Sequence, residues 1–187
     1  MNRPKLCFDF SSLHLKSARQ KCQAFYDLRN VFAHNYKSRT PFNLCFTNYR
    51  HEYDLPLRQI LLDRKLPHFV DLRIDEFGDD LFTKNQKLIV IMKDADKTIE
   101  RFDHTANYLV PVTVGKENPM SYPHDFIERL TDAPNVELVC LPFKDDLLGT
   151  KKRTNLLLHY RLLVSLQNGS HLEESLVKAA NPSSQMD

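Results

Sequence analysis

Glycine is scarce in this sequence, which has only four glycines and no tryptophan among its 187 residues. Neither a G-x-G-x-x-G turn nor a G-K-[ST] loop occurs, so the glycine-rich backbone cradles that hold phosphates are missing. The sequence therefore argues against a dinucleotide-binding Rossmann domain and against a P-loop enzyme.

Long apolar runs and metal-ligand spacings are also missing. No apolar run approaches about 18 residues, the length that crosses a membrane, so we expect no membrane partner. The four cysteines and eight histidines show no metal-ligand spacing, and no disulfide framework is evident, so we expect no metal site. Cys7, Cys45 and Cys140 lie in apolar, strand-like contexts, which predicts buried, reduced thiols. Reduced cysteines favour an intracellular location, and nucleus or cytoplasm versus mitochondrion stays open.

The composition is that of an ordinary globular domain. Apolar residues make up 42% and charged residues 27%, and the length suffices for one core. We expect the domain to cover residues 1–180, with a frayed tail at 181–187. The net charge is only +2, so a nucleic-acid partner would have to meet a local cluster of cations.

Short apolar runs alternate with helix-length amphipathic segments along the chain. Strands are expected at 6–10, 42–47, 88–92, 107–114 and 136–141, and segment 69–74 alternates like a further strand. Helices are expected at 15–36, with Leu15, Ala18 and Cys22 on its apolar face, and at 55–66, 96–104, 122–130, 154–167 and 171–180. This order predicts an α/β fold with roughly five parallel strands and helices on both faces of the sheet.

The stretch from Leu88 to Gly115 is central to this interpretation. It reads as a buried strand, a crossover helix and a second parallel strand. Ligands in such sheets bind beyond the carboxyl ends of the strands. The segments 92–94 and 114–116 are therefore the first places to look for a site.

Cations gather at several places. The open side of the first helix carries Lys16, Arg19, Lys21, Arg29 and Lys37. The densest cluster is Lys151-Lys152-Arg153, with Lys144 nearby, and Arg50 follows a strand end. These last five residues are candidates for contact with RNA phosphates, and the alternative for the cluster is a solvated helix start.

Several ordered motifs resemble one known family. The segments concerned are Phe8-Asp9-Phe10-Ser11, 41–48, 88–115, Cys140-Leu141-Pro142-Phe143 and 154–176 with Asn168-Gly169. Together they resemble the SPOUT-class methyltransferases that modify the N(1) position of the purine at position nine of tRNA. The resemblance covers nearly the whole chain, although each motif is loose.

This resemblance implies a fold, a cofactor and a partner. It implies a SPOUT-type domain with a C-terminal trefoil knot, in which the chain after Val114 threads through a loop. It also implies tRNA as the partner and S-adenosylmethionine as the cofactor. The residues that would line the cofactor pocket are Ile91, Met92, Val112, Lys116, Cys140 and Leu141.

The chain departs from the family at the proposed catalytic positions. Gly115 stands where the family has an aspartate, its proposed general base, and glycine has no group that accepts a proton. Pro111-Val112 replaces a pair of glycines, and Leu157 replaces a polar residue. Glu117 is the best substitute base, and its alternative is an exposed loop acid. We therefore expect methyl transfer to be impaired, and whether the chain is an enzyme stays open.

Three hypotheses follow from the sequence. The first is a monomeric, tRNA-binding member of this family with impaired catalysis. The second is an active methyltransferase with rearranged chemistry, because methyl transfer depends heavily on positioning. The third is an α/β protein-interaction module or a non-catalytic subunit of a tRNA-processing complex, with protein partners of the ribonuclease P type.

Overall fold

The described strands form one parallel sheet in the computed structural model, which describes residues 4–60, 70–74, 86–92, 95–112, 134–142 and 155–180. The strands are β1 (Lys5–Asp9), β2 (Asn43–Tyr49), β3 (Val70–Ile74), β4 (Leu88–Ile91), β5 (Asn107–Pro111) and β6 (Val136–Val139). Their order in the sheet is β3-β2-β1-β5-β4-β6, and every neighbouring pair is parallel. The sheet has six strands rather than five because segment 70–74 pairs with β2 as a strand.

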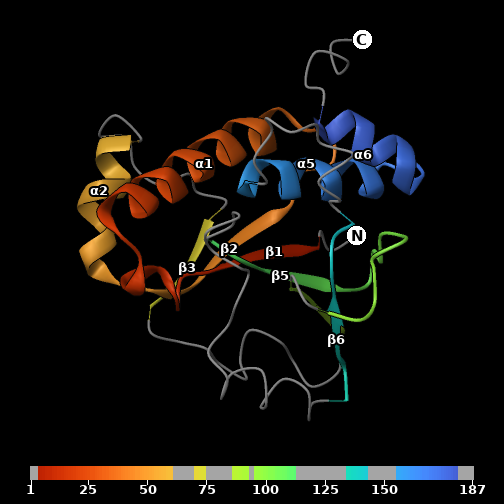
Figure 1. The fold of residues 1–187 in the computed structure, drawn as a ribbon, viewed down its shortest axis with the longest axis horizontal. Helices are drawn as coiled ribbons and strands as arrows, with labels where there is room; N and C mark the ends of the chain where they lie inside the picture. Colours follow the sequence, from red (N-terminus) through yellow and green to blue (C-terminus); the bar gives the residue numbers. More distant parts are fainter. Residues whose placement is uncertain are drawn as a thin grey trace.

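The described helices lie on one face of this sheet (Figure 1). They are α1 (Ala18–Lys37), α2 (Asp54–Ile60), α5 (Leu156–Gln167) and α6 (Leu172–Ala180), with short 3-10 turns η1 (Leu13–Leu15) and η2 (His51–Tyr53). Ser17 caps α1 in a capping box with Gln20, and Asn155 caps α5 by accepting from the Leu158 N–H. Within the part of the chain described here, no helix has the length and apolarity to cross a membrane.

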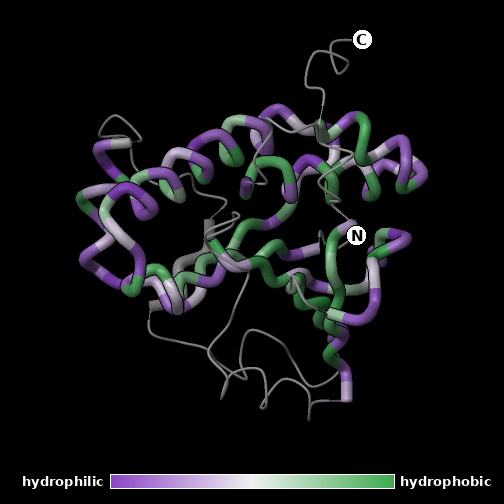
Figure 2. The backbone as a smooth tube through the Cα atoms, viewed as in Figure 1, coloured by the Kyte–Doolittle hydropathy of each residue, from purple (hydrophilic) through white to green (hydrophobic). Residues whose placement is uncertain are grey.

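The central strands are buried on both faces, as parallel sheets usually are. Every residue of β4 and β5 is buried, which explains why these strands read as continuous apolar runs. The larger core lies between the sheet and the helices and is rich in aromatic rings, among them Phe8, Phe10 and Phe46. A smaller apolar cluster, which includes Cys7, Cys45 and Leu109, lies on the opposite face of the sheet. In Figure 2 the strands are mostly apolar, and polar residues lie on the outer turns of the helices.

The crossover helix expected at 96–104 is wrong. This segment contains bends and one parallel bridge, between Thr98 and Cys140. The Cys140 N–H donates to the Lys97 carbonyl at 2.7 Å, and the Ile99 N–H donates to the Cys140 carbonyl at 3.1 Å. These bonds to the chain after β6 occupy backbone groups that a helix would pair internally, and β-branched Thr98 and Ile99 suit an extended backbone.

Three inward assignments in the first helix are also wrong, since Leu15 is 74% exposed and both Ala18 and Cys22 are exposed. The helix begins only at Ala18, after the Ser17 cap, so Leu15 lies in the preceding 3-10 turn, outside the helical spacing. Cys7 and Cys45 are buried as predicted, whereas Cys140 is partly exposed. The expected helix at 122–130 and the chain after Val112 in the fifth strand lie outside the described residues.

Candidate functional site

The carboxyl ends of β4, β5 and β6 meet at one edge of the sheet. β4 pairs with both other strands, and its Ile91 lies opposite Val139 of β6. This edge carries five of the six residues predicted to line the cofactor pocket: Ile91, Met92, Val112, Cys140 and Leu141. The sixth, Lys116, lies outside the described residues, as do Gly115 and Glu117. The structure therefore brings the predicted residues together, and their role in binding stays a prediction.

Three backbone N–H groups at this edge are already used inside the fold. The Met92 N–H donates to the Val139 carbonyl at 2.8 Å, and the Val112 N–H donates to the Asp9 carbonyl at 2.9 Å. The Cys140 N–H donates to the Lys97 carbonyl. The side chains of Ile91 and Val112 are buried in the core on the helical face. These three N–H groups are therefore engaged within the fold and are not free to bind a ligand.

Pro111 interrupts the hydrogen-bond ladder between β5 and β4. In a parallel ladder, alternate residues face the same neighbour, and Asn107 of β5 donates to the Lys87 carbonyl at 2.9 Å. In this register the residue placed to donate to the Ile91 carbonyl is Pro111, but proline has no backbone N–H. The pairing of β4 with β5 indeed ends two residues before Pro111. The Ile91 carbonyl therefore receives no ladder bond from Pro111.

Asp9 is a buried carboxylate that sequence reasoning did not single out as a site residue. It ends β1, is 1% exposed, and its Oδ1 accepts from the Asn48 amide at 2.7 Å and from the Ser11 N–H at 3.2 Å. The Ser11 hydroxyl also donates to Oδ2, and Thr47 Oγ1 lies 3.4 Å from Oδ1. Burial raises the pKa of Asp9, although the hydrogen bonds from Ser11, Asn48 and Thr47 oppose that rise.

The position of Asp9 in the sheet is notable because the strand order reverses there. β2 and β3 lie on one side of β1, whereas β5, β4 and β6 lie on the other side. In open parallel sheets such a switch point is where ligands bind. Asp9 lies opposite Pro111 across this point. A polar residue at a strand end, with Ser11 two residues later and Asn48 at the end of β2, was the signal available in the sequence.

Of the residues predicted to contact nucleic acid, only Arg50 is described. It is exposed and precedes η2, just beyond the carboxyl end of β2. Lys144, Lys151, Lys152 and Arg153 lie outside the described residues. The neighbouring rings of Tyr49 and Tyr53 are buried in the core, so they are not available to stack on a base. Across the described ranges, no three metal-ligating side chains gather at one place.

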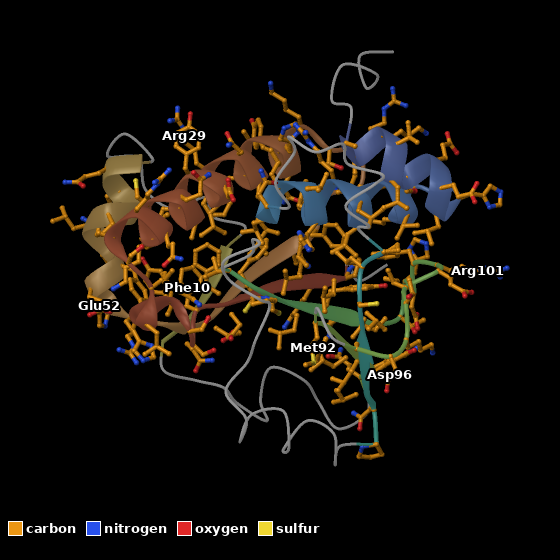
Figure 3. The ribbon with its side chains drawn as sticks, in the orientation of Figure 1. Phe10, Arg29, Glu52, Met92, Asp96 and Arg101 are labelled. Carbon is orange, nitrogen blue, oxygen red and sulfur yellow. The ribbon has the colours of Figure 1, made fainter. Side chains whose placement is uncertain are left out.

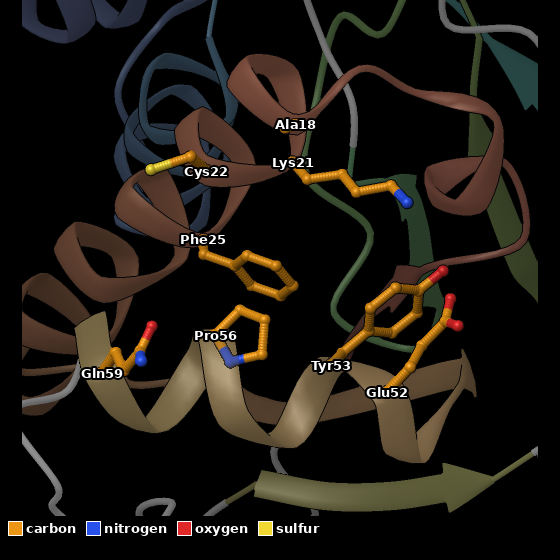
Figure 4. A pocket seen from close by; sticks show the side chains of 8 residues that line it. All are labelled: Ala18, Lys21, Cys22, Phe25, Glu52, Tyr53, Pro56 and Gln59. Atoms are coloured by element: carbon orange, nitrogen blue, oxygen red, sulfur yellow. The ribbon is translucent and has the colours of Figure 1, made fainter.

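A separate cavity of about 430 Å³ lies between α1 and the η2–α2 segment (Figure 4). Phe25 and Tyr53 are its most buried lining residues, and Lys21, Glu52 and Pro56 also line it. Burial raises the pKa of Tyr53 to about 12, so its phenol stays protonated at neutral pH. None of the predicted cofactor residues lines this cavity, so it is distinct from the edge formed by β4, β5 and β6.

Comparisons with known proteins identify the fold. No protein-family model and no curated protein matches the sequence. Full-length spTrm10 in complex with SAH, from S. pombe, superposes with a TM-score of 0.76 and 14% identity over 96% of this chain and 97% of that chain. The chain has the Trm10 fold.

Two archaeal Trm10 structures agree with this result. A dual-specific Trm10 from Thermococcus kodakaraensis has a TM-score of 0.69 and 11% identity, over 94% of this chain and 99% of that chain. Trm10 from Sulfolobus acidocaldarius has a TM-score of 0.61 and 8% identity, over 94% of this chain and 63% of that chain. The expected SPOUT-type α/β fold is therefore confirmed. The chain after Val114, on which the expected knot depends, lies largely outside the described residues, and the knot stays a prediction.

Proposed function

We propose that this protein is a divergent, tRNA-binding Trm10-type methyltransferase homologue in which methyl transfer is impaired. The observation that carries the proposal is the match to spTrm10, a structure solved with SAH, along nearly the whole length of both chains. The meeting of the predicted cofactor residues at the edge of β4, β5 and β6 supports it independently.

The residues at this edge fit a nucleoside cofactor in part. The Ile91 carbonyl, which receives no ladder bond from Pro111, suits the amino group of an adenine ring. Leu141 is partly buried and supplies apolar surface beside it. S-adenosylmethionine, when bound, supplies an electrophilic methyl group. This chain's own contribution would be to hold the adenosine with backbone carbonyls and apolar side chains, and Lys116 would complete the pocket.

Two features of the chain support impaired catalysis. Gly115 offers no carboxylate to accept the purine proton, and Glu117 is the proposed substitute. Val112 adds a branched side chain to the buried core at the position of a family glycine, so the backbone there is less open to close approach by a ligand. Loss of a general base typically costs about 10²- to 10⁴-fold in rate.

Binding and turnover measurements test the proposal directly. Isothermal titration with S-adenosylmethionine and with SAH measures cofactor affinity, and a gel-shift assay with a tRNA transcript carrying a purine at position nine measures RNA binding. We expect tRNA binding that weakens with salt, and methyl incorporation at least about 100-fold below that of spTrm10 assayed in parallel. Methylation at the spTrm10 rate would show that methyl transfer is not impaired in this protein. Failure to bind tRNA even at low salt would overturn the proposal and favour an interaction module.

Replacing Gly115 with aspartate is expected to leave methylation unrestored, because Pro111 and Val112 still limit access to the edge. The measurement is transfer of labelled methyl groups to the same transcript, with SAH affinity as the control for an intact cofactor site. Methylation that rises about 100-fold in the variant would instead show that the missing carboxylate is the main defect.

A further inference from the structure

The outward surface of α1 carries cations and exposed aromatic rings in an ordered arrangement. We define the α1 outer face as Arg19, Tyr26, Arg29, Tyr36 and Lys37, all of which are exposed. Tyr26 is 51% and Tyr36 77% exposed, although large apolar side chains usually lie inside. Figure 3 shows the Arg29 side chain directed away from the sheet. The opposite side of α1, with Phe25, Leu28 and Val31 among others, packs in the core.

Helical geometry places these residues along one surface. With 3.6 residues per turn, Arg19 and Tyr26 lie almost in line, and so do Arg29 and Tyr36. The face extends about 27 Å from Arg19 to Lys37, at 1.5 Å per residue. Arg29 lies 5.9 Å from the centre of the Tyr26 ring, within range of a cation–π contact. Cations and rings therefore alternate along the helix instead of forming one apolar patch.

The charge of this face has one sign. The only acidic residue of α1 is Asp27, which lies on the buried side and accepts from Gln23 at 2.9 Å. Among the described residues, no carboxylate forms an ion pair with Arg19, Arg29 or Lys37. A basic surface with interspersed aromatic rings is the combination that proteins use to bind single-stranded nucleic acid. Cations attract the phosphates, and the rings stack on unpaired bases.

We propose that the α1 outer face is an RNA-docking surface on which Tyr26 and Tyr36 stack against unpaired bases while Arg19, Arg29 and Lys37 contact phosphates. The two tyrosines are ten positions apart, or about 15 Å along the helix, so they engage separate nucleotides. This surface is distinct from the edge of β4, β5 and β6. The proposal rests on the RNA-binding part of the proposed function and adds the place of contact.

Fluorescence anisotropy with a labelled, unstructured RNA dodecamer tests this surface. The double variant Tyr26→Ala/Tyr36→Ala should weaken binding by about tenfold or more, since stacking contributes about 1–3 kcal/mol per base. Tyr26→Phe/Tyr36→Phe keeps the rings and should bind nearly as the wild type does. The matched control is Leu15→Ala/Leu55→Ala, which removes two equally exposed apolar side chains elsewhere. An abasic RNA of the same length should bind wild type and the alanine variant equally weakly.

The cations are tested through the salt dependence of binding. Arg19→Ala/Arg29→Ala/Lys37→Ala should reduce the slope of log K against log salt by about 2, because each phosphate contact on a single strand contributes about 0.7. All the substituted residues are exposed, so the thermal melts of the variants should coincide with that of the wild type.

The same variants assayed with the tRNA transcript separate this proposal from the proposed function. Suppose that the wild type binds both the tRNA transcript and the dodecamer, and that the alanine variants bind them equally well. RNA then docks elsewhere, which overturns the proposal for the α1 outer face while the proposed function stands. If wild type binds neither RNA, both proposals are overturned. Loss of binding in the tyrosine-to-alanine variant, with retention in the phenylalanine variant, supports the surface.

Discussion

Replacing Asn35 with alanine is expected to lower the free energy of unfolding by about 3 kcal/mol. Asn35 is 1% exposed near the end of α1, and its single amide makes three hydrogen bonds. Its Nδ2 donates to the Phe42 carbonyl at 3.1 Å, while its Oδ1 accepts from the Phe42 N–H at 2.9 Å and from the Tyr160 hydroxyl at 3.0 Å. Alanine would leave these groups buried without a partner, and each such group costs about 1–3 kcal/mol.

Urea denaturation measures this loss, and two variants bracket it. Tyr160→Phe removes only the hydroxyl and should cost about 1 kcal/mol. Asn30→Ala lies on the same helix but is only partly buried, and should change stability by less than about 0.5 kcal/mol. If Asn35→Ala proved no more destabilising than Asn30→Ala, the three hydrogen bonds would not be holding α1 to β2 and α5.

The position of Asn35 shows why helix faces are predictable while buried polar networks are not. Asn35 continues the inward spacing of Leu28, Val31 and Phe32, so the period alone places it on the buried side. Its partners, however, are Phe42, just before β2, and Tyr160 of α5, which lies about 125 positions away in sequence. No local pattern in the sequence connects Asn35 with Tyr160.

The same distinction explains the Leu88–Gly115 stretch. Its two strands were predictable because continuous apolar runs of this length suit buried parallel strands, and parallel strands end at the same edge. The register therefore places Ile91 opposite Val139, the residue before Cys140. The segment 96–104 was not predictable as irregular chain, because its backbone bonds are to Cys140, which follows β6 about 40 residues further along.

The candidate site was predictable only in its placement. Strand ends located the edge, but the sequence does not show that Pro111 would face the Ile91 carbonyl, because that depends on the ladder register. The basic side of α1 was predicted from helical spacing, and the structure confirms that Arg19, Arg29 and Lys37 are exposed. The same spacing places Tyr26 and Tyr36 on that side, and the structure adds that both rings are exposed.

Replacing Asp9 is expected to have the second large effect on stability, since Asp9 joins the turn after β1 to the end of β2 at the switch point of the sheet. Asp9→Leu is expected to destabilise the protein by about 2–3 kcal/mol, because the Asn48 amide and the Ser11 N–H and hydroxyl lose their common acceptor. Asp9→Asn is the matched control. It keeps an Oδ1 acceptor for Asn48 and Ser11, and its amide can donate to the Ser11 hydroxyl, which also accepts. Equal losses in the two variants would contradict this account.

The pH dependence of the Asp9→Asn effect follows from the raised pKa of Asp9. Burial raises that pKa above its ordinary value of 3.8, so the folded protein binds this proton more tightly than the unfolded chain does. The contribution of Asp9 to stability is therefore complete below pH 3.8 and is lost as pH rises through the folded-state pKa. Asparagine has no proton to lose, so the stability of Asp9→Asn relative to wild type should increase across this interval and then level off. Urea denaturation of both proteins at matched pH values measures the difference, in which all other titrating groups cancel. A difference that stayed constant with pH would mean that burial of the carboxylate costs the folded state nothing, and that the four donors around Asp9 fully replace water.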